Sequence, residues 1–137
     1  MIQIDKQLVR ELFDKAVVNP RLRMNYDLRT TENDNSQRML NALEPGTDIP
    51  IHRHRDTSET VVMLRGSVKE IFYTIEGGTA YPTAEFILKA GSDNCALQIP
   101  QGQWHSLECL EAHSVLFEAK DGAFVPRTDD DVFIPQT

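Results

Sequence analysis

Residues 46–66 read GTDIPIHRHRDTSETVVMLRG, and they carry the most specific pattern in the chain. In an extended strand, residues i and i+2 point to the same face, so His52 and His54 can present both imidazoles to one point. Glu59 follows the polar turn at 55–58, which is short enough to start the return strand of a hairpin and to bring the carboxylate alongside. The stretch therefore predicts three metal ligands that converge locally.

A fourth ligand is predicted further along the chain, at His105. Pro100 and Gly102 make a turn that places this histidine on a new strand. Neutral imidazoles and a carboxylate form a nitrogen and oxygen ligand set that suits divalent Fe, Mn, Zn, Ni or Cu, and two positions on an octahedral ion would stay open. We therefore expect one divalent transition metal, Fe, Mn, Zn or Ni, whose identity the ligand set leaves open.

The spacing in residues 46–66 resembles the first motif of the cupin superfamily: Gly, five residues, HxH, four residues, Glu, six residues and Gly. The second cupin motif is matched less closely. Eight residues separate Gly91 from Pro100 instead of the usual five, and Cys109 stands where the pattern has Asn. Pro100, Gly102 and His105 still fit this motif. The resemblance implies a cupin metal site and leaves the role of Cys109 open.

The whole chain also resembles the WbuC-type cupin-fold metalloproteins. The segments that carry this likeness are Pro20-Arg21-Leu22-Arg23, Gln37-Arg38, Asn41-Ala42, His52-Arg53-His54, Trp104-His105 and Phe117-Glu118-Ala119-Lys120. The resemblance implies a metal-binding cupin barrel associated with bacterial O-antigen and lipopolysaccharide biosynthesis. It does not imply a particular reaction.

The residue pattern after Asn35 predicts strands, because short runs of Val, Ile, Leu and Phe alternate with Gly and Pro. We expect strands near residues 37–43, 49–54, 59–65, 68–75, 84–89, 96–99, 103–110 and 114–120. Many short strands in succession indicate an antiparallel barrel or jelly roll rather than a parallel sheet. The expected fold class is all-β, a cupin antiparallel β-barrel (jelly roll) with an N-terminal helix.

The N-terminal helix is predicted from its cap and its apolar spacing. Asp5 can cap it, apolar residues follow at helical intervals, and Asn19-Pro20 ends it. Residues 20–35 are polar and irregular, which indicates an ordered loop or a short edge strand. Thr128 and Asp131 resemble a capping box for one last helical turn. We expect one cupin domain over residues 1–137, with helix and loop at 1–35, barrel at 36–120 and C-terminal tail at 121–137.

Composition excludes several partners. The 14 Lys and Arg residues against 21 Asp and Glu give a net charge of −7, which disfavours nucleic acid. The charged start lacks the apolar core of a secretory signal, and no apolar run reaches membrane-spanning length, so we expect a cytoplasmic protein without membrane insertion. Cys95 and Cys109 are expected to be reduced thiols. A homodimer is one way to cover the sheet edges.

A polar ligand pocket is predicted beside the metal. Arg38 and Asn41 precede the first motif in a strand that should border the site, and arginine is suited to a carboxylate or phosphate. Glu118 and Lys120 share one face of a later strand and could line the same pocket or form an exposed ion pair. The expected partner is therefore a small-molecule ligand, anionic or sugar-derived. Scattered basic residues that balance an acidic surface are the alternative reading of the arginines.

Three functions remain open at this point. The preferred one is a metal-dependent enzyme that acts on a small polar or sugar-derived metabolite. The first alternative is a non-catalytic module that binds or senses a metal or a small ligand. The second is a metal-independent sugar epimerase, which would need a histidine and a tyrosine as acid and base.

Overall fold

The computed structural model describes residues 1–136, which begin with the predicted helix, α1 (Lys6–Val18). Asp5 caps this helix, because its carboxylate accepts a hydrogen bond from the Leu8 backbone N–H at 2.9 Å. The helix buries Leu12 and Ala16 against the sheet behind it. Within residues 1–136, no helix is long and apolar enough to cross a membrane.

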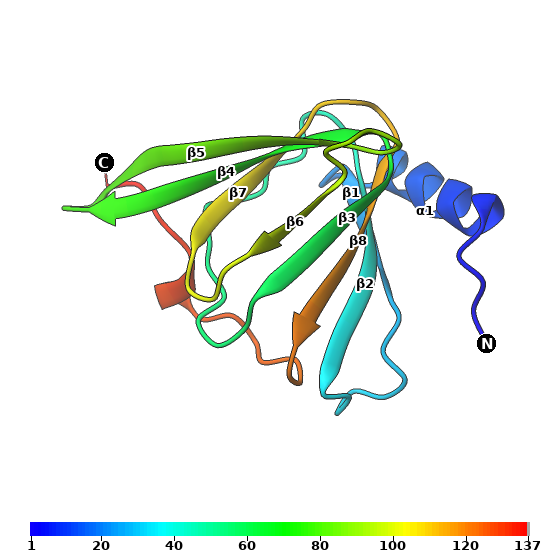
Figure 1. The fold of residues 1–137 in the computed structure, drawn as a ribbon, viewed down its shortest axis with the longest axis horizontal. Helices are drawn as coiled ribbons and strands as arrows, with labels where there is room; N and C mark the ends of the chain where they lie inside the picture. Colours follow the sequence, from blue (N-terminus) through cyan, green and yellow to red (C-terminus); the bar gives the residue numbers. More distant parts are fainter. Residues whose placement is uncertain (137) are drawn as a thin grey trace.

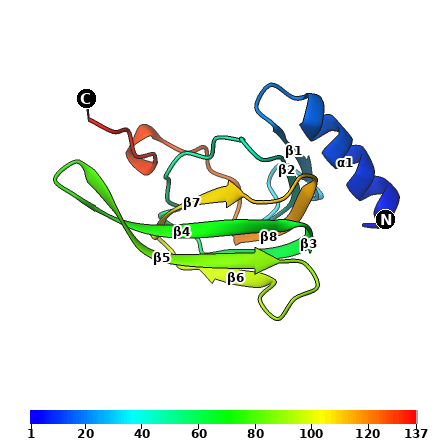
Figure 2. The ribbon, with the colours of Figure 1, turned by 90° about the horizontal axis from the view of Figure 1, so that it is seen from above.

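Eight strands form two antiparallel sheets (Figures 1 and 2). The strands are β1 (Arg23–Asp27), β2 (Ser36–Leu43), β3 (Glu59–Arg65), β4 (Ser67–Glu76), β5 (Thr79–Lys89), β6 (Ala96–Ile99), β7 (Trp104–Cys109) and β8 (Ser114–Asp121). The larger sheet has the order β1-β2-β8-β3-β6, and the smaller has the order β5-β4-β7. This arrangement confirms the predicted all-β fold with an N-terminal helix, a jelly roll whose two sheets do not join into one closed barrel in the described chain.

Strand alternation divides β2 between two cores. Leu40 and Ala42 face α1 and belong to an outer apolar cluster, whereas Leu43 belongs to the cluster between the two sheets. The inner cluster draws buried residues from both sheets, such as Met63 of β3 and Val68 of β4. The space between the sheets is therefore filled by apolar side chains around these residues, and the polar inward residues lie beyond them in a cavity.

The expected strand at 49–54 is the main departure from the prediction. Only His52 makes a β-bridge there, to His105 on one side and to Val132 on the other. Pro50 has no N–H to donate, which prevents a continuous ladder through this segment. The polar segment after α1, left open between a loop and an edge strand, contains the edge strand β1 paired with β2.

The C-terminal tail packs on the loop that carries His52 (Figure 1). A 3₁₀ turn at Asp129–Asp131 forms where the capping box was predicted. The Arg53 backbone N–H donates to the Asp131 carbonyl at 3.0 Å, and the Phe133 N–H donates to the Ile51 carbonyl at 2.8 Å. The loop between β2 and β3 thus has hydrogen-bonded neighbours on both sides.

Gly66, the last glycine of the first motif, is expected to tolerate no side chain. Its φ is +75°, and a Cβ there would lie 2.2 Å from the Ser114 Oγ and 2.9 Å from the Ser114 Cα. We expect Gly66→Ala to lower the free energy of unfolding by about 3 kcal/mol or more, from left-handed strain plus the clash. Gly91→Ala is the matched control, because Gly91 has a φ of +73° with nothing within 4 Å of the added Cβ.

The control variant should lose only the strain of the backbone, about 1 kcal/mol. Urea unfolding of both variants measures the difference between them. Equal losses of unfolding free energy in the two variants would contradict the prediction, because they would show that the chain relieves the clash with Ser114 without cost.

Candidate metal centre

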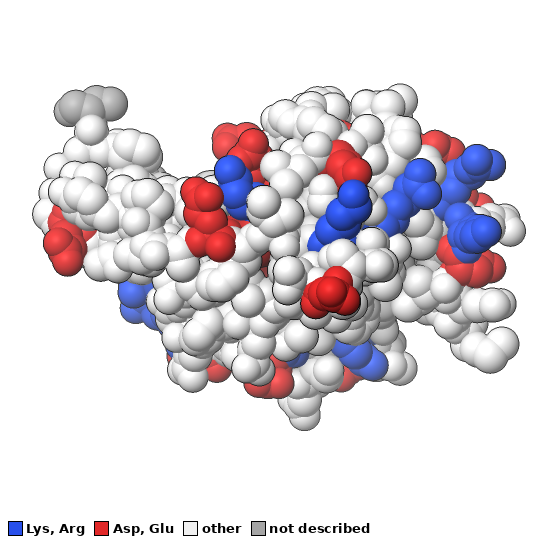
Figure 3. Space-filling view, turned by 45° about the horizontal axis from the view of Figure 1, so that its top comes forward, with Lys and Arg blue, Asp and Glu red and all other residues white. Residues whose placement is uncertain are grey.

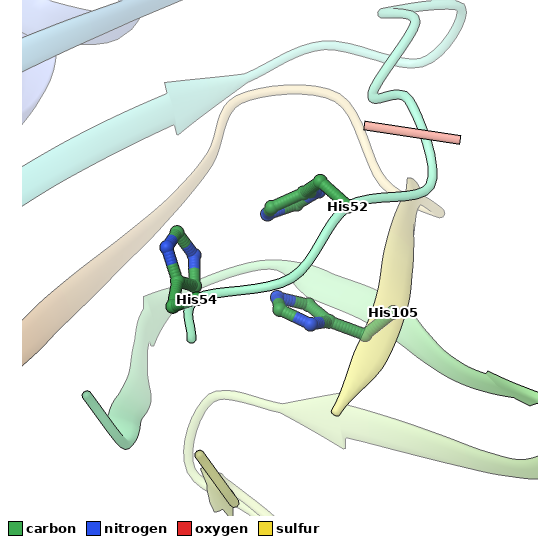
Figure 4. Close-up of side chains that lie close together, drawn as sticks. All are labelled: His52, His54 and His105. Atoms are coloured by element: carbon green, nitrogen blue, oxygen red, sulfur yellow. The ribbon is translucent and has the colours of Figure 1, made fainter. Parts of the chain in front are cut away.

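Three histidine side chains converge between the sheets (Figure 4). His52 and His54 come from the loop before β3, and His105 comes from the start of β7. One ring nitrogen from each lies within 4.8 Å of the other two. The ring centroids of His52 and His105 are 4.3 Å apart, and those of His52 and His54 are 5.1 Å apart. The spacing of HxH therefore brings two imidazoles to one point even though the segment is largely not a strand.

Backbone contacts fix which nitrogen each ring presents. The His52 Nδ1 lies 2.8 Å from the Pro50 carbonyl, and the His105 Nδ1 lies 2.9 Å from the Gln103 carbonyl. A carbonyl can only accept, so each Nδ1 carries the proton and each Nε2 keeps its lone pair. His52 and His105 also exchange backbone hydrogen bonds of 2.9 and 2.8 Å. Orientation of a ligating imidazole by a carbonyl is the usual second-layer support of a metal site.

Glu59, the first residue of β3, brings a carboxylate to the same point. It is 4% exposed, and its Oε2 lies 3.0 Å from the His54 Nε2 and 3.6 Å from the His105 Nε2. Despite this proximity, the Glu59 Oε2 and the His54 Nε2 are buried without a hydrogen-bond partner in the described residues. Orphaned polar atoms of this kind are costly, and one cation between them would satisfy both. The donor set thus fits a bound metal ion.

The pKa values of the Glu59 and Glu118 carboxyl groups shift in opposite directions. Burial raises the pKa of Glu59, but its contacts with Glu118 and then His105 and His54 outweigh burial and hold the pKa well below the usual range. Burial, followed by the nearby charge of Glu59, holds the pKa of Glu118 well above its usual range. Glu59 is therefore the ionised member of the pair, as a metal ligand must be.

The pKa values of His52 and His105 shift in opposite directions. Burial, followed by the charge of His105, lowers the pKa of His52 to about 3. Burial also acts to lower the pKa of His105, but the contact with Glu59 outweighs it and the pKa is raised. His52 is consequently neutral at physiological pH and available as a nitrogen ligand.

The three histidines and Glu59 line a cavity of about 1090 Å³. Three of the candidate pocket residues, Asn41, Glu118 and Lys120, line this cavity. The Asn41 Nδ2 donates to the Glu118 Oε2 at 3.3 Å, and the Lys120 Nζ lies 3.7 Å from the same oxygen. Because Lys120 is only 14% exposed, its pairing with Glu118 is part of the cavity wall rather than a surface ion pair.

Arg38 does not line the cavity. It lies an odd number of residues from Asn41 on β2, so its side chain points to the opposite face, where it pairs with Asp34. The expectation that both residues border the site overlooked this alternation. Cys109, whose role the second motif left open, belongs to the apolar core between the sheets.

Glu70 of β4 is a cavity residue that the sequence analysis missed. It is 2% exposed, it lines the cavity, and its Oε2 has no hydrogen-bond partner in the described part of the chain. Burial raises its pKa to about 8. A signal was present in the sequence, because Glu70 shares a strand face with Val68, and a lone carboxyl on an apolar face is unusual.

These observations define the class of protein as a cupin-fold protein, with a jelly roll that holds a cluster of three histidines. A family described as a domain of unknown function, DUF6016, matches residues 4–83, and the chain belongs to this family. The matched region includes His52, His54 and Glu59 but ends before His105. No curated protein matches the chain.

Solved structures with the same fold include KdgF from Halomonas sp., with 18% identity and a TM-score of 0.56 over 82% of this chain and 87% of that one. CapF, a capsular polysaccharide assembling protein from Staphylococcus aureus, matches with 18% identity and a TM-score of 0.63 over 88% of this chain and 33% of its own. An oxalate oxidase in complex with glycolate matches with 16% identity and a TM-score of 0.59 over 77% and 54%. Likeness at these identities shows the fold alone; the resemblance to WbuC-type proteins stays a prediction.

Proposed function

We propose that this protein binds one divalent transition metal, Fe, Mn, Zn or Ni, and uses it as an enzyme on a small polar, sugar-derived metabolite. The proposed ligands are His52, His54, Glu59 and His105. One observation carries the proposal: three imidazole nitrogens lie within 4.8 Å of one another beside the orphaned Glu59 Oε2, at the wall of a cavity. A small ligand fits a cavity of this size.

When bound, the metal supplies a Lewis acid that polarises a carbonyl or hydroxyl oxygen of the ligand. The other tasks fall to residues of the chain. Carbonyl contacts hold the rings of His52 and His105 in place. Glu70 presents a buried carboxyl oxygen without a partner to the cavity, where it can hand a proton to the ligand or accept one.

The fold neighbours support the choice of metabolite. The oxalate oxidase structure holds glycolate, a small hydroxy acid, and CapF is described as assembling capsular polysaccharide. These descriptions fit a small oxygen-rich ligand and a role in bacterial surface polysaccharide synthesis, which the WbuC-type resemblance also implies. A cytoplasmic location is part of the same proposal.

The rival functions differ in what they require of the cavity. An epimerase that works without metal needs a tyrosine beside a histidine, but none of the tyrosines is among the described residues that line the cavity. Tyr73 instead has its hydroxyl 3.1 Å from the Ser106 Oγ. A non-catalytic binding module would keep the metal ligands without needing the buried carboxyl of Glu70, which favours the enzyme.

The test is metal analysis followed by a turnover screen. Protein purified without an affinity tag should contain close to one transition-metal ion per chain. We expect one member of a panel of sugar acids, sugar phosphates and nucleotide sugars to be converted by the metal-loaded protein and not after treatment with a chelator. Binding without conversion across the panel would favour the non-catalytic module, and turnover that survives chelation would contradict the proposed mechanism.

A further inference from the structure

We propose that Arg21, Arg23 and Arg127 form a binding subsite for an oxyanion, a carboxylate or a phosphate, at the open side of the cavity. These three residues are called the arginine cluster below. The inference deepens the proposed function, because it fixes the charge of the ligand and the direction in which the ligand lies. It does not depend on the metal, since the cluster consists of residues other than the metal ligands.

The arginine cluster is drawn from two distant parts of the chain. Arg23 is the first residue of β1, Arg21 lies in the turn just before it, and Arg127 lies in the C-terminal tail, yet all three line the same cavity. Arg21 and Arg127 are exposed and Arg23 is half-buried, which places the cluster at the open side, away from the buried Glu59. The Arg23 Nη1 donates to the Asp48 carbonyl at 2.6 Å, which fixes its guanidinium in position.

Acidic residues at the cavity neutralise other arginines but not this cluster. The Asp131 carboxylate pairs with Arg53 and Arg55, and Asp130 lies 3.8 Å from Arg55. Within residues 1–136, no carboxylate lies within ion-pair distance of any member of the cluster. Three arginines line one cavity without an ion pair in the described residues, although the chain carries a net charge of −7. Bidentate arginine contacts are the usual way in which proteins hold carboxylates and phosphates.

The charges of the arginine cluster also interact with one another. Burial, followed by the charge of Arg21, lowers the pKa of Arg23, and the charge of Arg127 acts in the same direction. The charge of Asp48 opposes these effects without overcoming them. Because these charges repel one another, a bound anion would relieve the repulsion.

The cavity wall on the metal side has the opposite character. Glu59 and Glu70 are buried there and Glu118 is half-buried, with the Lys120 Nζ 3.7 Å from the Glu118 Oε2. In the metal-free protein, an anionic group is repelled by Glu59, whereas a hydroxyl or carbonyl oxygen is not. The inference accordingly places the acidic group of the ligand on the arginine cluster and its uncharged oxygens toward the histidines. On the face shown in Figure 3, by contrast, acidic and basic side chains are interspersed.

Arginine side-chain NMR tests the subsite with acetate and inorganic phosphate as probes. At constant ionic strength, we expect saturable shifts of the Arg21, Arg23 and Arg127 Nε–Hε signals and none at Arg10, an exposed residue of α1. Arg23→Gln and Arg127→Gln should each weaken the apparent affinity about tenfold, because each removes one charge-assisted contact. Arg10→Gln is the matched control and should leave the affinity unchanged.

Running the titration with and without bound metal separates the two proposals. Shifts that persist in metal-free protein support the subsite even if the metal analysis fails. Tighter binding of acetate assigns a carboxylic acid as the ligand, and tighter binding of phosphate assigns a phosphate ester. Shifts no larger than those of Arg10, or anion binding that needs the metal and survives the Arg23→Gln and Arg127→Gln changes together, would overturn the inference.

Discussion

Changing His105 to alanine is expected to reduce the metal content of the purified protein from close to one ion per chain to a small fraction. His105 supplies one of three clustered imidazoles and is buried, with its Nδ1 held by the Gln103 carbonyl. Loss of second-layer support alone lowers metal affinity about 10- to 100-fold, so loss of the ligand itself should exceed about 100-fold. Elemental analysis and competition with a chromophoric chelator measure both quantities.

The control for this change is the remaining histidine, His113. It pairs with Glu44 at 2.7 Å, stacks on Phe13 and is not among the residues that line the cavity. His113→Asn is preferred to alanine because the φ of +60° at this position is one that asparagine tolerates. We expect full metal content in this variant. Equal metal content in the His105→Ala and wild-type proteins would place the metal elsewhere.

Changing Glu70 to methionine is expected to stabilise the metal-free protein, and to do so more as the pH rises. Burial raises the pKa of Glu70 to about 8, from an ordinary value of 4.5. The folded state thus binds more protons than the unfolded state between these two values, so ionisation of Glu70 opposes folding as the pH increases through that window. The cost is absent below about pH 4.5 and reaches roughly 5 kcal/mol above pH 8, an upper value for 3.5 pKa units.

Urea unfolding of the metal-free proteins at pH 5, 6.5 and 8 measures this effect. The methionine variant should gain several kcal/mol over wild type at pH 8 and little at pH 5. Glu76→Met, on the exposed end of the same strand, serves as the control and should show no such trend. If Glu70→Met destabilises the protein equally at every pH, then Glu70 has a partner that offsets its burial. The same variant should lose turnover if Glu70 moves the proton.

The local part of the site was predictable because its geometry is encoded over a short stretch. Two histidines two residues apart and a glutamate a few residues later can meet through one loop, and the structure clusters His52 with His54 and places Glu59 beside His54, although residues 49–54 do not form the predicted hairpin strand. His105 was predictable from the turn before it and from the motif. Their role as metal ligands stays a prediction that the His105→Ala experiment tests.

The rest of the cavity depends on pairings between distant strands. Glu70 reaches it because β4 pairs with β7, and Arg127 reaches it because the tail folds back over the loop at His52. Neither pairing can be deduced from spacing along the chain. The sequence analysis placed Arg38 at the cavity wrongly for a simpler reason. Strand β2 is buried on both faces, and only every second residue of it turns toward the cavity.

The fold class was confirmed, whereas several strand limits were not predicted. β5 begins at Thr79, five residues before the predicted start, because Tyr81 and its neighbours extend the pairing with β4 toward the turn at Gly77-Gly78. Pro82 interrupts neither strand, since β5 is the edge of its sheet and β4 shifts register beside it. An edge strand has weaker sequence requirements, which is why its length was underestimated.

The tail at residues 129–133 acts on the site through the backbone of the loop that it covers. That loop is the middle member of a small ladder, with β7 on one side and the tail on the other. Detachment of the tail would leave His52 supported from one side only. The exchange rate of the Arg53 amide hydrogen, which is bonded to the Asp131 carbonyl, should therefore report how often the loop at His52 opens.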